Sequence, residues 1–187
     1  MSGAANQQAN ASARMVLSPD EGETVWLRKL GIRFMIGGEE TQGNFALVEH
    51  PIGPRALAAP MHTHEREDEY TYVLEGKIGF QIGEEVLVAQ PGDLVFKPRG
   101  VPHAFWNAAD GPARALEIIS PAGFERYFAE LAPLFPPANE GPLDEEAVGA
   151  VREKYGLEMD MGSIPVLAER HGLAIDAPRL PRSSTGE

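Results

Sequence analysis

Cysteine is absent from the 187 residues of the sequence. This absence excludes a disulfide scaffold, a thiol nucleophile, a zinc ribbon and an iron–sulfur cluster, because each of these needs cysteine sulfur. Any metal ion must therefore be held by histidine and carboxylate side chains alone. The length fits one domain with appendages and is sufficient for a hydrophobic core.

Basic residues are scarce, with 16 Lys and Arg against 28 Asp and Glu, which gives a formal net charge of −12. This balance argues against a nucleic-acid partner, because phosphate contacts need a clustered basic face. The acidic residues are spread along the chain, which indicates a solvated surface. No apolar run approaches the ~18 residues of a membrane span, and residues 1–13 lack the pattern of a secretion signal. We expect a cytoplasmic protein that binds neither nucleic acid nor a membrane.

Short apolar or alternating runs, separated by Gly, Pro, Asp or Asn, fill residues 14–120. The runs expected to form strands are Thr24–Leu30, Ile32–Ile36, Phe45–Glu49, Tyr70–Leu74, Lys77–Ile82, Glu85–Val88, Leu94–Lys97, Ala104–Asn107 and Ala113–Ile119. Many short strands with regular turns are typical of an all-β sandwich or barrel.

The pattern becomes helical after Pro121, with helices expected over residues 124–131, 144–155 and 164–171. The first of these places four apolar side chains on one face: Phe124, Tyr127, Phe128 and Leu131. We therefore divide the chain into four parts. They are a flexible leader (residues 1–13), a β-barrel (14–120), a helical C-terminal extension that packs on the barrel or on a partner subunit (121–175), and a disordered tail (176–187).

Three of the five histidines lie at spacings that predict one shared site. His62 and His64 are two residues apart, so on a strand both imidazoles point to the same face. Glu69 follows a polar link as the next strand begins and can return a carboxylate to the same place. His103 starts a strand after a turn rich in Pro and Gly. Three neutral imidazoles and one carboxylate suit a divalent first-row metal, with one or two positions left for water or substrate.

The remaining acidic and histidine residues near this group have simpler interpretations. Strand alternation turns Asp68 away from the face of Glu69, and we expect Glu67 and Asp68 to form a solvated acidic turn. His50 ends an apolar strand and is expected at the surface or as a capping residue. His171 is expected to face solvent.

Strand alternation from the expected ligands also predicts the interior wall of the barrel. The side chains expected to line a substrate pocket are Phe45, Leu47, Thr71, Val73 and Phe105. Such a wall is apolar and suits a hydrophobic or aromatic ligand, although the same residues would fill a small barrel without any ligand.

The same alternation turns Tyr70, Tyr72 and Trp106 outward, where the C-terminal helices or a second subunit would have to cover them. Closed dimers are the commonest oligomers, so we expect a homodimer. The basic residues nearest the site are expected on the surface or in turns: Arg55, Lys97 and Arg99.

Two segments of the chain resemble the two motifs of the cupin family. They read His62-x-His64-x4-Glu69-x6-Gly76 and Gly92-x5-Pro98-x-Gly100-x2-His103-x3-Asn107. The chain departs from the first motif at its leading glycine, where it carries Ala56. The resemblance covers about residues 45–120. It implies a double-stranded β-helix, or jelly-roll barrel, with the metal inside its mouth.

The segment HTHEREDEYTYVLEG, from His62 to Gly76, is similar to single-domain cupins of the quercetin-dioxygenase-like type, as is the stretch over residues 123–128. This resemblance implies a metal-dependent oxidoreductase, in the first place a dioxygenase that uses O2 on a small enolic or phenolic, flavonol-like substrate. Glu69 would then act as the catalytic base as well as a metal ligand.

Two other functions stay open. The ligand set is shared with non-oxidative isomerases, lyases and decarboxylases, so the fold alone does not decide the chemistry. A cupin can also bind a small molecule without turning it over. The metal is equally open, because three histidines and a glutamate accept Fe, Mn, Ni, Cu or Zn.

Overall fold

A computed structural model describes residues 16–135 and 143–174 of the chain. The predicted leader (residues 1–13) and the predicted tail (176–187) lie outside the described residues. The elements follow in the order β1 (Thr24–Leu27), β2 (Leu30–Ile36), β3 (Ala46–Ile52), β4 (Leu57–His64), β5 (Asp68–Glu75), β6 (Ile78–Ile82), β7 (Glu85–Ala89), β8 (Leu94–Lys97), β9 (His103–Asn107), β10 (Ala113–Ser120), α1 (Glu125–Leu131), the 3-10 turn η1 (Ala132–Leu134), α2 (Glu145–Lys154), β11 (Leu157–Met159) and α3 (Ser163–His171).

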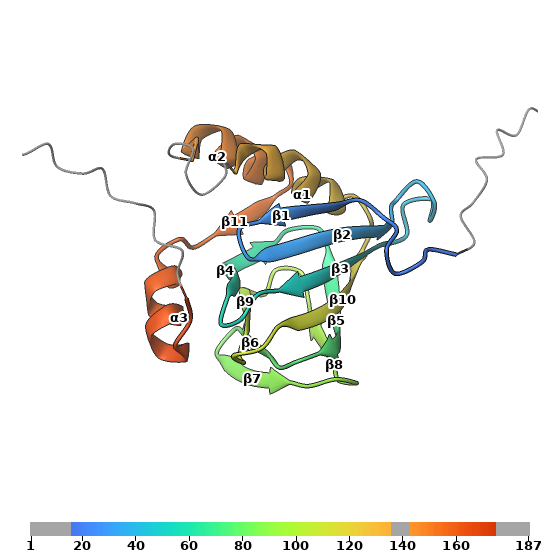
Figure 1. Ribbon diagram of the computed structural model, residues 1–187. Helices are drawn as coiled ribbons and strands as arrows, with labels where there is room; N and C mark the ends of the chain where they lie inside the picture. The colour runs from blue at the N-terminus through green and yellow to red at the C-terminus, as the bar shows by residue number, and fades with distance from the viewer. Residues whose placement is uncertain (1–15, 136–142, 175–187) are drawn as a thin grey trace, which may run out of the picture.

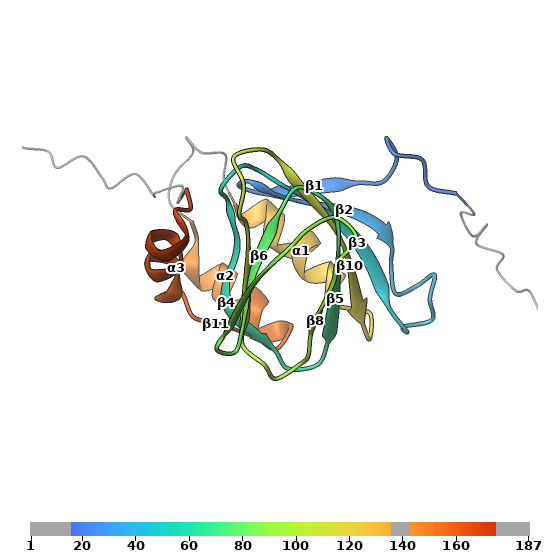
Figure 2. The same cartoon turned by 90° about the horizontal axis from the view of Figure 1, so that it is seen from below.

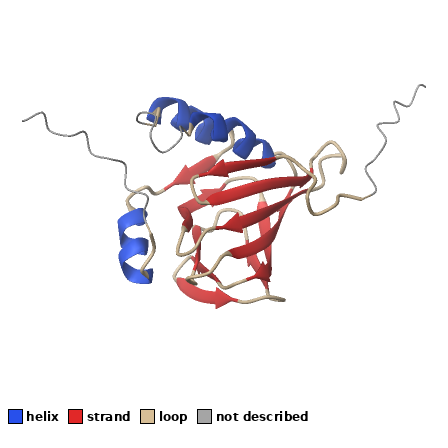
Figure 3. Ribbon diagram, in the orientation of Figure 1, coloured by secondary structure: helices blue, strands red, loops and turns tan. Residues whose placement is uncertain are grey.

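Two antiparallel sheets form the body of the molecule, and the helices lie outside them (Figures 1 and 3). One sheet has the strand order β1-β2-β3-β10-β5-β8, and the other has the order β11-β4-β9-β6-β7. The central neighbours in each sheet, β3-β10-β5 and β4-β9-β6, come from distant parts of the sequence, so the chain crosses repeatedly between the sheets as a jelly roll does. The all-β barrel with C-terminal helices, expected from the alternating runs, is confirmed.

Three details of the strand prediction were wrong. The expected strand Thr24–Leu30 is a hairpin, because Arg28 adopts a left-handed backbone angle (φ 57°) and Leu27 pairs with Leu30. Strand β4 was expected only around His62 and His64, but it begins at Leu57; its Ala58-Ala59-Pro60 segment has low β propensity. The three-residue strand β11 follows a helix and carries no alternating run. It pairs with β4.

The core fills the space between the two sheets and extends to α1. Val73, Phe80 and Ile119 from the strands are fully buried. Phe124 and Phe128, from the start of α1 and its middle, join the same cluster. Figure 2, which looks between the sheets, shows α1 across the far end of the barrel. The amphipathic face predicted for the first helix therefore closes one end of the barrel.

The helix α3 covers the outer face of the second sheet. Trp106 points outward from β9 as predicted, and it is buried against Leu167 and Leu173 of the C-terminal segment. The ring of His171 stacks on the indole, with 4.1 Å between ring centroids. The expectation that His171 faces solvent was therefore wrong. Gly79 of β6 is the cross-strand partner of Trp106 and lies directly against the indole.

No other described residue covers the outward side chains of β5 and β8 in this way. Tyr72, Leu74 and Phe96 are exposed, and Tyr70 stacks on Phe96 with 4.9 Å between ring centroids. The C-terminal helices thus cover Trp106 and leave the outward aromatic and apolar side chains of β5 and β8 exposed to solvent. The homodimer stays a prediction. Among the described residues, no helix is long and apolar enough to cross a membrane.

The contact between Gly79 and Trp106 leads to a stability prediction with a matched control. A Cβ atom at Gly79 would lie 2.2 Å from the indole, so Gly79→Ala forces Trp106 and α3 to shift. We expect the free energy of unfolding to fall by about 1–3 kcal/mol. Gly149, exposed in the middle of α2, has open space around it, and Gly149→Ala is expected to raise this free energy by about 0.5–1 kcal/mol. Urea denaturation measures both, and equal midpoints for the two variants would contradict the packing described.

Candidate metal centre

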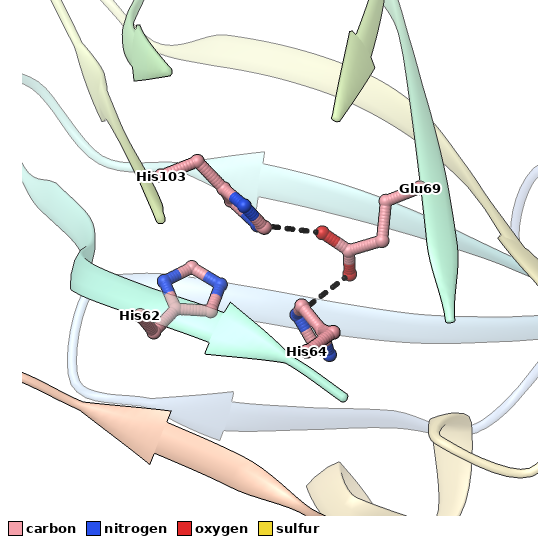
Figure 4. A group of neighbouring side chains, drawn as sticks. All are labelled: His62, His64, Glu69 and His103. Atoms are coloured by element: carbon pink, nitrogen blue, oxygen red, sulfur yellow. Dashed lines mark hydrogen bonds and ion pairs between the residues drawn. The ribbon is translucent and has the colours of Figure 1, made fainter. Parts of the chain in front are cut away.

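Three histidines and one glutamate meet inside the barrel, close to α1. His62 and His64 come from β4, Glu69 from β5 and His103 from β9, and one ligand atom of each lies within 4.8 Å of the others. All four side chains are buried. Figure 4 shows the imidazoles and the carboxylate pointing toward one another. The structure thus brings together the four residues that the sequence predicted as metal ligands.

Strand register explains this gathering. His62 and His103 are direct partners on the neighbouring strands β4 and β9. His64 follows His62 on the same face of β4. Glu69 stands on the opposite sheet, where it pairs with Lys97 of β8. Because both sheets turn these residues inward, the carboxylate faces the imidazoles across the barrel interior.

Two backbone carbonyls orient the imidazole rings. Nδ1 of His62 lies 2.7 Å from the carbonyl oxygen of Pro60, and Nδ1 of His103 lies 2.9 Å from that of Val101. A carbonyl only accepts, so each Nδ1 carries the proton and donates it. In the neutral ring the lone pair is then on Nε2, the nitrogen that turns toward the cluster, which is the arrangement that a metal-binding histidine requires.

The remaining polar atoms support a cation between these groups. Neither ring nitrogen of His64 has a hydrogen-bond partner, although the residue is fully buried. Its Nε2 lies 3.4 Å from Glu69 Oε1, and Nε2 of His103 lies 3.2 Å from Glu69 Oε2. Buried polar atoms without partners are costly, and a divalent metal would satisfy them. The four residues therefore fit a metal ion.

The protonation states also suit a metal. Burial lowers the pKa of His62 well below its usual value, and neighbouring His103 and His64 lower it further. Burial likewise lowers the pKa of His103. Burial alone would raise the pKa of Glu69, but its basic neighbours His64 and Lys97 hold it well below the ordinary value. The pKa shifts favour neutral His62 and His103 and an ionised Glu69, which are the forms that bind metal.

Two charged residues behind Glu69 were not predicted at the site. Lys97 was expected on the surface or in a turn, but it is 1% exposed, and its Nζ lies 2.8 Å from Glu69 Oε2 and 3.1 Å from Glu117 Oε1. Burial raises the pKa of Glu117 to about 7, against the lowering effect of Lys97. Alternation could have found Lys97, since Val95 two residues earlier also points inward. The same alternation along β10 could have placed Glu117 inside the barrel.

The structure places three of the five side chains predicted to line a pocket inside the barrel, and two outside it; the pocket itself stays a prediction. Thr71, Val73 and Phe105 are buried inside the barrel. Phe45 is exposed and Leu47 is half-buried. Strand β3 starts at Ala46, so the alternate residues Ala46, Val48 and His50 point inward in place of Phe45 and Leu47.

His50 and Glu67 were also placed wrongly by the sequence. His50 is buried, its Nδ1 donates to the carbonyl of Gly31 at 3.0 Å, and its ring packs against Phe105 and Phe128. Glu67 is buried, with Oε2 3.7 Å from His64 Nδ1. The other member of the acidic turn, Asp68, pairs with Arg99 near the surface, as expected for a solvated acid.

An aromatic side chain from the C-terminal extension closes the site. Phe124 lies edge-on to the ring of His64, with 4.3 Å between centroids. Strand β11 lies along β4 and pairs Leu157 with His64 and Met159 with His62. The extension therefore contacts the two ligand-bearing positions of β4 from two directions and separates them from water.

Loss of one predicted ligand should empty the centre. We expect His103→Ala protein to retain less than a tenth of the metal bound by the unaltered protein, because three remaining ligands leave a weaker and less constrained site. His171→Ala, which removes a histidine outside the cluster, serves as the control and should keep its metal. Elemental analysis of the folded, purified proteins measures both. Full metal occupancy in His103→Ala would show that the ligands are assigned wrongly.

The buried His50 predicts a loss of stability in mild acid. Burial lowers its pKa from 6.5 to about 4, so between these values the unfolded chain binds a proton that the folded chain does not. The free energy of unfolding should therefore fall as the pH drops from 6.5 to 4, with about 3 kcal/mol of the loss due to His50. Urea denaturation of the metal-free protein at a series of pH values measures this loss. We expect the free energy of unfolding of His50→Gln to fall by about 3 kcal/mol less than that of the unaltered protein over the same pH range. An equally steep curve would contradict the assignment.

Comparison with known proteins agrees with this geometry. Residues 49–119 match the cupin domain family. A search of curated proteins finds no match. Among solved structures, a predicted oxalate decarboxylase from Thermotoga maritima superimposes with a TM-score of 0.53 at 19% identity, over 57% of this chain and 98% of that one. KdgF from a Halomonas species gives a TM-score of 0.51 at 16% identity, over 59% of this chain and 96% of that one.

The polyketide cyclase RemF from Streptomyces resistomycificus gives a TM-score of 0.50 at 25% identity, over 56% of this chain and 78% of that one. The matched family segment includes all four residues of the cluster, and these neighbours share the barrel. From the two sequence motifs, the jelly-roll topology and the family match together, the chain contains a cupin domain over residues 49–119.

Proposed function

We propose that the protein is a metal-dependent cupin enzyme, and specifically a dioxygenase that acts on a small enolic or phenolic substrate. The observation that carries the proposal is the buried group of His62, His64, Glu69 and His103, whose ligand atoms lie within 4.8 Å of one another. A divalent transition metal held there would supply Lewis acidity toward a substrate oxygen and, if redox-active, reactivity toward O2.

The side chains around the group suit a flat, apolar substrate. Val73 and Phe105 from the two sheets and Phe128 from α1 belong to one continuous apolar cluster beside the four polar residues. A wall of this kind favours an aromatic ring over a sugar and keeps water away from the reacting atoms.

Among the described residues, Glu69 supplies the carboxylate of the proposed metal site. Its lowered pKa keeps it ionised, and an ionised carboxylate is the form that accepts a proton. Any carboxylate is a weak base, so it suits an acidic substrate hydroxyl, such as that of an enol or a phenol. This matching favours enolic and phenolic compounds over aliphatic alcohols.

Access to the group requires movement of the aromatic cover. Phe124 packs on His64, and both side chains are buried. A substrate must displace Phe124 or enter beside it, so the start of α1 is expected to influence which substrates are accepted.

A non-oxidative metal-dependent reaction is the second candidate. It is favoured by the likeness to a polyketide cyclase, at 25% identity over 56% of this chain. An isomerase, lyase or decarboxylase would use the same ligands and the same apolar wall, and would differ in consuming no O2.

Elemental analysis followed by oxygen uptake tests the proposal. The purified protein is loaded in turn with Fe, Mn, Ni, Cu and Zn and supplied with a panel of enolic and phenolic compounds. We expect one or more redox-active metals to support O2 consumption coupled to substrate loss, and His103→Ala prepared in the same way to consume none.

Other outcomes of this experiment separate the alternatives. Substrate loss without O2 uptake would contradict the dioxygenase and support the non-oxidative enzyme. Binding of the panel compounds by metal-loaded protein, without turnover of any, would support a small-molecule-binding cupin.

A further inference from the structure

Lys97 is held between two carboxylates in the barrel interior. Its Nζ lies 2.8 Å from Glu69 Oε2 and 3.1 Å from Glu117 Oε1, and all three side chains are almost completely buried. The ring of Phe105 closes another side, with its centroid 5.0 Å from Nζ. The ammonium group is therefore confined on three sides.

The second carboxylate is itself fixed. Glu117 stands on β10, and its Oε2 accepts a hydrogen bond from the hydroxyl of Thr71 at 2.8 Å. Thr71 lies on β5, two residues beyond Glu69 on the same inward face. Lys97, Glu117 and Thr71 thus form a rigid polar network behind the carboxylate of Glu69.

Stability alone is a weak explanation for this network. Taking charged groups out of water costs several kcal/mol per ion, and apolar side chains of similar size often give an equally stable or more stable interior. Val95, the other inward residue of β8, is such a side chain. The buried charges therefore point to a task at Glu69, the member of the network that reaches the metal centre.

We propose that Lys97 is a positioning residue that fixes the carboxylate of Glu69, so that Glu69 offers a metal one oxygen in a set orientation. The inference rests on the proposed metal site. Lys97 contacts Oε2, which also lies 3.2 Å from His103 Nε2, and the other oxygen, Oε1, faces His64 Nε2 at 3.4 Å. Without the ammonium group the carboxylate could rotate, and both oxygens would compete for the ion.

The direction of the effect on metal affinity distinguishes positioning from charge. A buried ammonium group repels a divalent cation, so a role through charge alone predicts that metal binds more tightly when Lys97 is removed. Positioning predicts the opposite, because groups that hold a ligand in place typically contribute a factor of about 10–100 to metal affinity.

Cobalt(II) binding tests the proposal on the full-length protein, with affinity and visible absorption as readouts that need no substrate. We expect Lys97→Met to bind Co2+ about 10–100-fold more weakly and to change the intensity of the cobalt d–d bands, because the coordination by Glu69 changes. Lys97→Gln, which keeps an N–H donor without the charge, should lose less affinity than Lys97→Met. Unchanged or tighter binding by Lys97→Met, with an unchanged spectrum, would overturn the proposal.

Control variants keep the result interpretable. Arg99→Met removes a positive charge two residues away that pairs with Asp68 near the surface, and it should bind Co2+ as the unaltered protein does.

If Lys97→Met does not fold, Glu117→Gln tests the proposal instead, since it loosens the ammonium group of Lys97 and keeps an acceptor. We then expect weaker cobalt binding and the same spectral change, and unaltered binding would overturn the proposal. Failure of the unaltered protein to bind Co2+ would instead defeat the proposed metal site.

Discussion

A carboxylate inside a barrel must be given partners, and the interior of this protein is arranged around the partners of Glu69. The oxygens of Glu69 face Lys97, His64 and His103, which come from β8, β4 and β9. These strands belong to both sheets, so the spacing between the sheets is linked to the geometry of one side chain. The apolar residues around the group exclude water, and this exclusion makes each of the charge interactions stronger.

The C-terminal extension is part of the same arrangement. The aromatic face at the start of α1 supplies Phe124 against His64 and Phe128 against His50. Strand β11 extends the second sheet next to the ligand-bearing β4. The cupin family match ends at residue 119, and the residues beyond it complete the enclosure of the barrel interior.

Much of the fold and of the candidate site could be predicted from the sequence, because both depend on local spacing. Two histidines two residues apart on a strand share a face whatever the rest of the fold does, and turns rich in Gly and Pro fix where His103 begins its strand. The amphipathic pattern of the first helix is also local, and its four apolar residues are all buried.

The predictions that failed depend on long-range packing. A lysine is usually exposed, and the expectation for Lys97 followed that tendency. The alternation of β8 indicated the inside of the barrel, but that position is tolerable for a lysine only because Glu69 and Glu117, both distant in the sequence, place carboxylates beside it. Which residues of β3 point inward depended on whether the strand began at Phe45 or at Ala46. A shift of one residue moves every side chain of the strand to the opposite face. Similarly, His50 is buried because α1 folds back over the barrel.

The pairing of β11 with β4 has a consequence for how the protein can be divided. The backbone of Met159 and Leu157 is hydrogen-bonded to the strand that carries His62 and His64. A fragment that ends with the matched family segment would leave β4 as an open edge and strip the apolar cover from His64. The barrel and the extension therefore form one cooperative unit in thermodynamic terms. Any ion captured at the centre would stabilise the docking of a segment that contributes no ligand to it.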